Sequence, residues 1–366
     1  MLQRLYIDNF HCLVNFELRL GPINLLLGAN GSGKSSVFDA LRRLQDFLIG
    51  GARVHDSFPS RSLTRWDTRS LQSFELELLD ADHPFTYRLV IEHDRPRQRM
   101  RVQEERLSLR GQNLFASEGG QAQLYRDDFS PGPQYPLDWS LSGLGALHER
   151  PDNQLLSRFK RALARLVLLR PVPQTMASES RSESLRLDWQ AQNFVSWYRR
   201  AAQEYLGANS AFLTELGQVL PAFESLSIRQ SGEDTRVLKA WFAAPAGGRL
   251  EIDFSELSDG QKQLILLYAL LYVLREEKPS LFIDEPDNFV ALREIQPWLA
   301  QLSDAIGSQI EQTVLISHHP ELINHLGQAH GQWLWREGSG PVRVSAAPAA
   351  TDGLNLSETL AREWHT

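Results

Sequence analysis

Cysteine is nearly absent from this chain: Cys12 is the single one in 366 residues. That excludes an intramolecular disulfide and any cysteine-based zinc site. No apolar run approaches 18 residues, and the start lacks a charged lead followed by an apolar signal segment, so we expect a cytoplasmic protein without a membrane segment. Lysine is also scarce, and the net charge is −7. Any contact with nucleic acid must therefore come from a local basic patch.

The hydrophobic content suffices for a packed core, because 42% of the residues are hydrophobic and nine are Trp. The hydrophobic periodicity predicts three strands before residue 28, a helix over Ser36–Phe47 and an antiparallel meander within 73–109. Residues Ser117–Ser142 carry Gly, Pro and Asp without a clear period, which predicts a surface loop. The final third alternates helix and strand, which favours an α/β fold with a parallel sheet. We find no internal repeat and no coiled-coil heptad run.

The most informative stretch is a glycine-rich loop between an apolar strand and a helix, Gly28-Ala29-Asn30-Gly31-Ser32-Gly33-Lys34-Ser35. This spacing is the Gly-x4-Gly-Lys-Ser phosphate loop in its expected context. Glycines let successive backbone N–H groups turn toward phosphates, and the following helix directs its positive end at them. Lys34 would reach the β- and γ-phosphates and Ser35 would ligate Mg²⁺. The predicted nucleotide contacts are Asn30, Gly31, Ser32, Gly33, Lys34, Ser35 and Ser36.

A second site element is the apolar strand Leu281-Phe282-Ile283, which ends in Asp284 and Glu285. A phosphate-loop enzyme needs an acidic residue at a neighbouring strand end to hold Mg²⁺, and Asp284 fits that role. Glu285 would orient or deprotonate the attacking water. The alternative is an acidic turn that caps the next element.

A helix start precedes that strand at Leu257-Ser258-Asp259-Gly260-Gln261, where Ser258 or Asp259 would supply the capping oxygen. Together with the apolar-Asp-Glu-Pro segment, this order resembles the signature motif of ABC-type ATPases. The resemblance implies that Ser258, Gly260 and Gln261 bind the γ-phosphate of ATP held by a second copy, in a head-to-tail dimer. The family more often has Gly at position 259, so the Asp259 carboxylate is tolerable there only if it points away from the phosphates.

The strand Thr313–Ile316 leads into Ser317, His318 and His319. It resembles the switch segment of the same class, which implies that His318 contacts the γ-phosphate or relays a proton to the attacking water. We expect His319 to be structural, because a His-His pair lacks the further ligands that a metal needs.

The opening Leu5-Tyr6-Ile7-Asp8-Asn9-Phe10 resembles the RecF, SMC and OLD group of ABC ATPases. Many members have Arg or Lys after the Asn-Phe pair, and His11 occupies that place here, so it is a candidate phosphate contact. The resemblance also implies a Mg²⁺-ligating glutamine, for which Gln174 is our candidate. It covers residues 1–50 and 255–335 well and the middle of the chain only in pattern.

The length of the chain distinguishes between the SMC, OLD and RecF branches of that group. No coiled-coil arm of SMC type fits, and the 48 residues after His318 are too few for the nuclease domain that OLD-type members carry. RecF-like size remains the nearest match, but the segment Asp284–Phe289 looks closer to stand-alone AAA-type ATPases of bacterial defence operons. Asp80 and Asp82 could mimic a nuclease metal pair, yet they lie in a predicted hairpin turn.

Two sets of basic side chains are candidates for DNA contact, although such runs are usually solvated faces. The first alternates along a turn and strand, and the second lies on the predicted helix Gln154–Leu166. They are Arg95, Arg97, Arg99 and Arg101, and Arg158, Lys160, Arg161 and Arg165.

The sequence therefore predicts an α/β P-loop NTPase, a single ABC-ATPase head over residues 1–366. Its β-rich lobe with the phosphate loop spans 1–110, a helical insertion spans 178–221, and the signature, acidic strand and switch His span 255–335. We expect it to bind ATP and Mg²⁺, to form an ATP-dependent homodimer and to hydrolyse ATP slowly. The first reading of its role is the regulatory ATPase of an anti-phage defence complex with a separately encoded nuclease or effector. The alternative is a RecF-like ATPase that binds DNA in repair; no membrane contact is expected.

Overall fold

The computed structural model describes residues 1–350 and 354–363. The chain divides into two compact units. Unit 1 comprises Met1–Leu166 and His330–Pro348; unit 2 comprises Val167–Ala329 and the stretch from Ala349. Within the described residues, no helix combines the length and apolar character needed to cross a bilayer.

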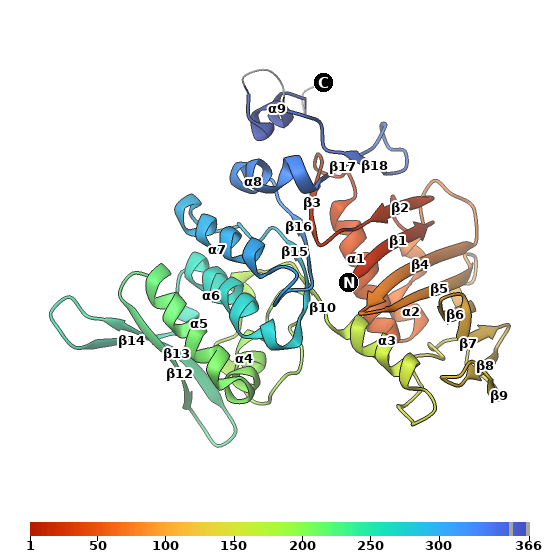
Figure 1. Cartoon of the computed structure of the whole chain (residues 1–366), viewed down its shortest axis with the longest axis horizontal. Helices are drawn as coiled ribbons and strands as arrows, with labels where there is room; N and C mark the ends of the chain where they lie inside the picture. The colour runs from red at the N-terminus through yellow and green to blue at the C-terminus, as the bar shows by residue number, and fades with distance from the viewer. Residues whose placement is uncertain (351–353, 364–366) are drawn as a thin grey trace. The chain divides into compact units, whose positions relative to one another are not determined.

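Unit 1 is built on an antiparallel sheet in the order β2-β1-β4-β5-β6-β7-β8-β9 (Figure 1). The strands are β1 (Leu2–Asp8), β2 (Phe16–Arg19), β4 (Leu71–Asp80), β5 (His83–Asp94), β6 (Arg99–Leu109), β7 (Gln112–Glu118), β8 (Gln121–Tyr125) and β9 (Pro131–Pro136). Side chains of β4 alternate between buried and partly exposed positions, as in a sheet with one face on the core. The predicted meander is therefore confirmed.

Helices cover the buried face of this sheet. They are α1 (Lys34–Ile49), the short α2 (Val54–Ser57) with the 3-10 turn η1 (Ser60–Ser62), and α3 (Gln154–Ala164). Phe159 of α3 packs its ring against Phe85 and Tyr87 of β5, with centroids 5.7 and 5.8 Å apart. Unit 1 also contains β3 (Ile23–Leu27), β17 (Gly331–Trp335) and β18 (Arg343–Ala346); β17 runs parallel to β3 and antiparallel to β18.

The loop predicted over Ser117–Ser142 is wrong, because β8 and β9 and the end of β7 lie within it. Gly119 and Gly120 both have positive φ, 56° and 82°, and form the two-residue turn that joins β7 to β8. The Gly-Gly pair thus indicates a hairpin, but the flanking strands lack the strict alternation of apolar and polar residues by which a strand is recognised. The polar stretch 52–69 contains α2 and η1.

Unit 2 has the strands β10 (Leu166–Leu169), β15 (Ser280–Asp284) and β16 (Gln312–Ile316), with β15 between the other two. β15 and β16 are parallel and fully buried, which explains their continuous apolar sequences. The helix α6 (Asp259–Tyr272) is buried on nearly all sides, and Trp298 of α7 (Leu292–Ala305) donates its indole N–H to the Leu267 carbonyl. Strand–helix alternation in this part of the chain is confirmed.

A second small sheet and further helices complete unit 2. Strand β13 pairs with β11, β12 and β14, and α5 packs against β12. The helical insertion predicted over 178–221 contains the helices α4 and α5. The remaining elements are β11 (Glu179–Ser180), α4 (Phe194–Glu204), α5 (Leu206–Val219), β12 (Phe223–Gln230), β13 (Arg236–Ala243), β14 (Arg249–Asp253), α8 (Pro320–His330), α9 (Leu356–Glu363), and the 3-10 turns η2 (Pro173–Thr175), η3 (Phe254–Glu256) and η4 (Leu274–Glu277).

Candidate nucleotide-binding site

The glycine-rich loop of unit 1 connects β3 to α1, as the sequence predicts. Gly28 and Gly33 have φ of 143° and 100°, values that L side chains rarely adopt. A Cβ at Gly28 would lie 2.1 Å from the Leu334 carbonyl oxygen, and one at Gly33 would lie 2.6 Å from Cγ2 of Val342. The loop thus needs glycine both for its backbone conformation and for its close packing against β17 and the segment before β18.

Lys34, the first residue of α1, lies over this loop with little exposure. Its Nζ donates to the carbonyl oxygens of Gly28 and Ala29 at 2.6 and 3.1 Å. Asn30, Gly31 and Ser35 are exposed. The Lys34 ammonium therefore lies at the mouth of the loop, at the positive end of α1, which is where an anion is stabilised.

Ser32 gives a test of whether a phosphate fits. Its hydroxyl oxygen is buried and has no hydrogen-bond partner among the described residues. A buried hydroxyl without a partner costs free energy, so a ligand oxygen that accepts its proton would be stabilising. The Ser36 hydroxyl oxygen accepts a hydrogen bond from the Cys12 thiol, at 3.7 Å. The donors in this loop, an ammonium, a hydroxyl and helix N–H groups, fit a phosphate chain.

Two residues that the sequence reasoning missed flank the loop. Arg336, just after β17, donates from Nη1 to the Gly31 carbonyl at 3.2 Å, and its guanidinium lies 5.5 Å from the ring centroid of Trp66. Arg336 also donates to the carbonyls of Ser339 and Gly340. Trp66 remains 48% exposed. The one signal available in the sequence was a Trp within a polar stretch that predicts a loop.

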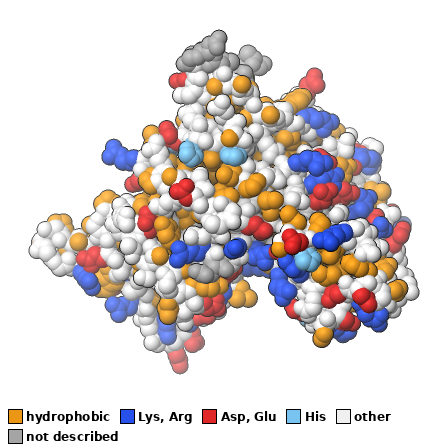
Figure 2. Space-filling view, viewed as in Figure 1, with side chains coloured by type: hydrophobic (Ala, Val, Ile, Leu, Met, Phe, Trp, Pro, Cys, Tyr) orange, Lys and Arg blue, Asp and Glu red, His pale blue; other side chains and the backbone are white. Residues whose placement is uncertain are grey.

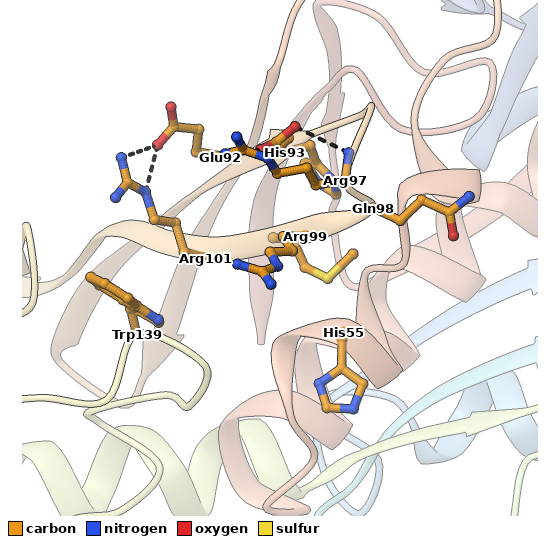
Figure 3. Close-up of a pocket in the computed structure, with 10 residues that line it drawn as sticks. His55, Glu92, His93, Arg97, Gln98, Arg99, Arg101 and Trp139 are labelled. Atoms are coloured by element: carbon orange, nitrogen blue, oxygen red, sulfur yellow. Dashed lines mark hydrogen bonds and ion pairs between the residues drawn. The ribbon is translucent and has the colours of Figure 1, made fainter.

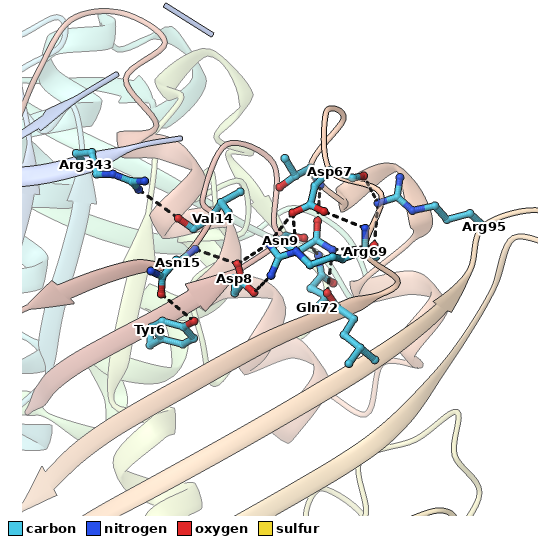
Figure 4. A network of polar contacts seen from close by, with 12 residues as sticks. Tyr6, Asp8, Asn9, Val14, Asn15, Asp67, Arg69, Gln72, Arg95 and Arg343 are labelled. Carbon is cyan, nitrogen blue, oxygen red and sulfur yellow. Dashed lines mark hydrogen bonds and ion pairs between the residues drawn. The ribbon is translucent and has the colours of Figure 1, made fainter. Parts of the chain in front are cut away.

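A polar network holds the segment that carries Trp66 (Figure 4). The buried Asn9 side chain donates to the carbonyls of Arg69 and Leu71 and accepts from the Thr64 N–H. Arg69 pairs with Asp8 and Asp67, and Arg95 donates to the carbonyls of Asp67 and Arg69. The Asp8-Asn9 pair of the opening motif thus fixes residues 64–71.

His11 faces α1. Its Nε2 lies 3.5 Å from Oδ2 of Asp39, and its φ is 49°. Burial of Asp39 acts to raise the pKa of its carboxyl, but hydrogen bonds from His11, Arg43 and Arg42 outweigh it and hold that pKa well below its usual range. The structure therefore gives His11 an anionic partner within α1, and its contact with phosphate stays a prediction.

In unit 2, the acidic and histidine segments lie at one sheet edge. Asp284 ends β15 and is in register with Ile316, the end of the parallel strand β16. Side chains that follow both strands therefore meet, and His318 Nε2 lies 3.9 Å from Glu285 Oε1. Asp284 is 2% exposed, with Nε of Arg170 3.9 Å from its carboxylate. The pairing of Glu285 with His318 brings together the two residues predicted to be catalytic.

Glu285 has a left-handed backbone, with φ of 58°, and its N–H donates to the Ile316 carbonyl. Such a conformation is uncommon for a non-glycine residue and often occurs at functional sites. The His319 N–H donates to Ser317 Oγ, and His319 Nδ1 accepts from the Glu321 N–H at the start of α8. These contacts agree with the structural role expected of His319. Among the described residues, no cluster of His, Cys, Asp and Glu suits a metal ion.

The signature segment begins α6 as expected. Ser258 is the N-cap: its Oγ accepts from the Gln261 N–H, and Gln261 Oε1 accepts from the Ser258 N–H, which forms a capping box. A Cβ at Gly260 would lie 2.6 Å from the Phe289 carbonyl oxygen, so glycine allows α6 to approach the loop after β15. Gln263 of the same helix donates to the Pro286 carbonyl at 2.9 Å.

Asp259 and Gln174 contact each other. Gln174, in η2, donates from its amide to the Asp259 carboxylate. This bond occupies the Asp259 carboxylate, which as an anion at the signature position would otherwise oppose phosphate binding. The proposed Mg²⁺-ligating role of Gln174 is not tested by this contact and stays a prediction.

Most of the candidate DNA-binding side chains have partners within the chain. Arg158 and Arg165 both pair with Asp80, Lys160 donates to three backbone carbonyls, and Arg161 pairs with Glu149. Figure 2 shows acidic and basic side chains intermixed over the part of unit 1 in view. Because Asp80 is held by two arginines in the β4–β5 turn, it supports the hairpin and gives no sign of a metal pair with Asp82.

Comparisons with known proteins agree with this geometry. The family described as "AAA domain, putative AbiEii toxin, Type IV TA system" matches residues 23–324. The OLD nuclease of Thermus scotoductus is 40% identical over 50 residues, 14% of this chain and 9% of that protein. The DNA replication and repair protein RecF of Shewanella loihica is 36% identical over 74 residues, 20% of this chain and 19% of that protein. The chain thus matches less than a fifth of the length of either relative.

Solved structures of SMC heads share the fold. An SMC head bound to the C-winged helix domain of ScpA has a TM-score of 0.59 at 12% identity, covering 94% of this chain and 98% of that one. An SMC head with an extended coiled coil, bound to the C-terminal domain of ScpA derived from Pyrococcus furiosus, has a TM-score of 0.56 at 11% identity, covering 100% and 98%. The chain therefore has the P-loop ABC-ATPase fold and belongs to this AAA-domain family, as an ABC-type ATPase of the RecF, SMC and OLD group.

Proposed function

We propose that this protein binds Mg·ATP through the phosphate loop, hydrolyses it slowly and forms a head-to-tail homodimer around it. The observation that carries the proposal is the loop itself: Lys34 is held over it by two carbonyls, and the buried Ser32 hydroxyl lacks a partner among the described residues. Both groups would satisfy phosphate oxygens. A glycine turn without these donors would only cap a helix.

The residues proposed to hold Mg²⁺ are Ser35 and Asp284, with Gln174 as a third candidate. Their hydroxyl, carboxylate and amide oxygens are hard donors of the kind that Mg²⁺ takes. When bound, Mg²⁺ neutralises charge that develops on the phosphates. Nε of Arg170 lies 3.9 Å from the Asp284 carboxylate, so this buried carboxylate already has one cationic neighbour.

Glu285 is the proposed general base, acting on the attacking water, and His318 the proposed γ-phosphate contact. Their side-chain atoms are 3.9 Å apart, too far for a direct hydrogen bond, so each would act on the attacking water or the γ-phosphate rather than on the other. The strained backbone of Glu285 supports a positioned role, because strain of this kind needs surrounding contacts to hold it.

The start of α6 is the proposed second anion site, used for ATP held by another copy. Ser258 caps the helix, Gly260 permits close packing, and Gln261 completes the capping box. Free N–H groups in the first turn and a hydroxyl suit a γ-phosphate. The Asp259 carboxylate accepts a hydrogen bond from the Gln174 amide and keeps its charge, so a phosphate fits here with that carboxylate held on Gln174 and turned away.

We further propose that Trp66, stacked on Arg336 beside Gly31, provides an aromatic surface for the nucleobase. An indole ring that is half exposed next to a phosphate loop can stack on a base, and stacking contributes about 1–3 kcal/mol per base in other proteins.

The test of this mechanism is Glu285→Gln. The variant retains nucleotide binding but loses the base, so we expect an ATP-dependent dimer by size-exclusion chromatography with light scattering, and turnover at least about a hundredfold below wild type. Asp287→Asn, a second carboxylate in the same loop, is the matched control and should turn over ATP. A Glu285→Gln protein that stays monomeric with ATP and hydrolyses it normally contradicts the composite-site mechanism.

For the biological role we propose a regulatory ATPase of an anti-phage defence complex, which uses ATP to hold or release a separately encoded nuclease or effector. The family description, a putative toxin of a toxin–antitoxin system, supports this role. Co-purification of the tagged protein with the product of the adjacent gene, dependent on ATP, is expected. A protein that functions alone with no stable partner contradicts it.

The second candidate is a RecF-like ATPase that binds DNA in repair, which the 74-residue match to RecF favours. Filter binding of duplex DNA at two salt concentrations tests it, because phosphate contacts make the affinity fall steeply with salt. Affinity that stays unmeasurable with ATP at low salt removes this candidate.

A further inference from the structure

A pocket separate from the phosphate loop lies at the end of the β5–β6 hairpin in unit 1 (Figure 3). Its volume is about 680 Å³, within the range of small-molecule sites. The residues that line it include His93, Arg97, Arg99, Arg101 and Trp139. None of them belongs to the phosphate loop or the acidic segment.

The charges of this pocket leave one cation available. Arg101 pairs with Glu92 at 2.6 Å, and Arg97 with Asp94 at 3.6 Å. The Arg99 side chain has no ion-pair or hydrogen-bond partner within residues 1–350 and 354–363. Figure 3 shows its side chain between Trp139 and His55. Two carboxylates thus neutralise two arginines, and Arg99 remains to bind an anion.

An aromatic surface lies beside that cation. Trp139 is 53% exposed, and the Arg101 guanidinium lies 5.8 Å from its ring centroid. The Val102 N–H donates to the Trp139 carbonyl, which fixes this residue against β6. An indole ring held in this way and still half in solvent can stack on a planar ligand.

His93 adds a hydrogen-bond acceptor. The Gln72 amide nitrogen donates to the Asn9 carbonyl, so Gln72 Oε1 is the atom that faces His93 Nε2, at 3.3 Å. Nε2 must then carry the proton, which leaves Nδ1 as an acceptor. Nδ1 is buried and has no partner among the described residues. A buried acceptor of this kind is stabilised by a ligand N–H or O–H.

We propose that this pocket binds a nucleotide unit: the base stacks on Trp139, the phosphate pairs with Arg99, and His93 accepts a hydrogen bond from the base or sugar. The unit comes either from a free nucleotide or from a single-stranded nucleic acid. The proposal does not rest on the ATPase mechanism above, since it uses none of the same residues.

Isothermal titration of the full-length protein with dAMP and with the single strand d(A)6 tests the site. We expect both Arg99→Ala and Trp139→Ala to weaken binding at least about tenfold, because each removes a charge-assisted or stacking contact. Trp139→Phe should retain most of the affinity, which separates stacking from a folding defect. Lys34→Ala should leave this binding unchanged, and so distinguishes the pocket from the phosphate loop.

Arg106→Ala, on the same strand β6, and Trp335→Ala, another exposed Trp, are the matched controls and should bind like wild type. If dAMP binds as tightly as d(A)6, the ligand is a free nucleotide; if d(A)6 binds more than tenfold tighter, the ligand is a strand. Absence of binding to either probe overturns the proposal. So does binding that survives in both Arg99→Ala and Trp139→Ala, or that is lost in Lys34→Ala.

Discussion

Gly260→Ala gives a sharp test of how α6 is placed. Glycine within a helix normally costs about 0.5–1 kcal/mol relative to alanine, so the substitution alone should stabilise the protein. At this position, however, the added Cβ would lie 2.6 Å from the Phe289 carbonyl oxygen. Real Cβ contacts are rarely under 3.0 Å, so α6 or the loop after β15 must move by about 0.4 Å or more.

Both groups at this contact belong to backbone, and the Gln263–Pro286 hydrogen bond links the same two segments. Overpacking of this kind costs typically about 1–3 kcal/mol. At about 2–4 °C per kcal/mol, we expect the melting temperature to fall by roughly 2–12 °C. Since the loop starts at Glu285, ATP turnover should fall as well.

Gly207→Ala in α5 is the matched control, because a Cβ there meets nothing within 4 Å. It should raise the melting temperature slightly, so the two Gly→Ala changes are expected to have opposite signs. Thermal unfolding followed by circular dichroism, with phosphate release measured on the same preparations, gives both readouts. A Gly260→Ala protein that is stabilised like the control and keeps its turnover refutes the reasoning.

Three further predictions concern unit 1. Burial, with the charge of Arg95, lowers the pKa of His93 to about 4 in the folded protein. Below about pH 6.5 the unfolded chain therefore binds more protons at this residue than the folded chain does. The free energy of unfolding should therefore drop by about 2 kcal/mol from pH 7.5 to pH 5 through this group, a loss that His93→Gln removes in urea unfolding. Arg336→Ala should weaken fluorescent ATP-analogue binding about fivefold, because it frees the Gly31 carbonyl and the Trp66 ring. Asp80→Asn should lower the free energy of unfolding by about 2 kcal/mol, because it leaves two arginines without their carboxylate.

The Arg336 and Asp80 variants each have a control variant in the same unit, and His93→Gln is compared with wild type. Arg343, which also donates to backbone carbonyls, should tolerate Ala without loss of nucleotide affinity. Asp82→Asn, at the exposed end of the same turn as Asp80, should leave stability unchanged. Equal pH dependence in wild type and His93→Gln, or equal effects of a variant and its control, would contradict the corresponding argument.

The sequence predicts the phosphate loop, the N-cap at Ser258 and the parallel strands that end at Asp284 and Ile316, because these depend on local patterns of glycine, capping residues and apolar runs. It could not predict the contact of Gln174 with Asp259, since that depends on how η2 packs against α6. Nor could it find Arg336 and Trp66 at the loop: they are 270 residues apart in the sequence and meet only through the fold. The missed hairpin after residue 117 has a different origin: β9 is too exposed to show a hydrophobic alternation.

The central claim is that the phosphate loop and the carboxylate after β15 serve one reaction. The most direct measurement is release of phosphate from γ-labelled ATP by the full-length protein with Mg²⁺, compared with Lys34→Ala and Glu285→Gln under the same conditions. We expect wild type to release phosphate slowly. Lys34→Ala should neither bind ATP nor release phosphate, whereas Glu285→Gln should bind ATP without releasing phosphate. Wild-type protein that releases no phosphate, or either variant releasing it at the wild-type rate, contradicts the claim.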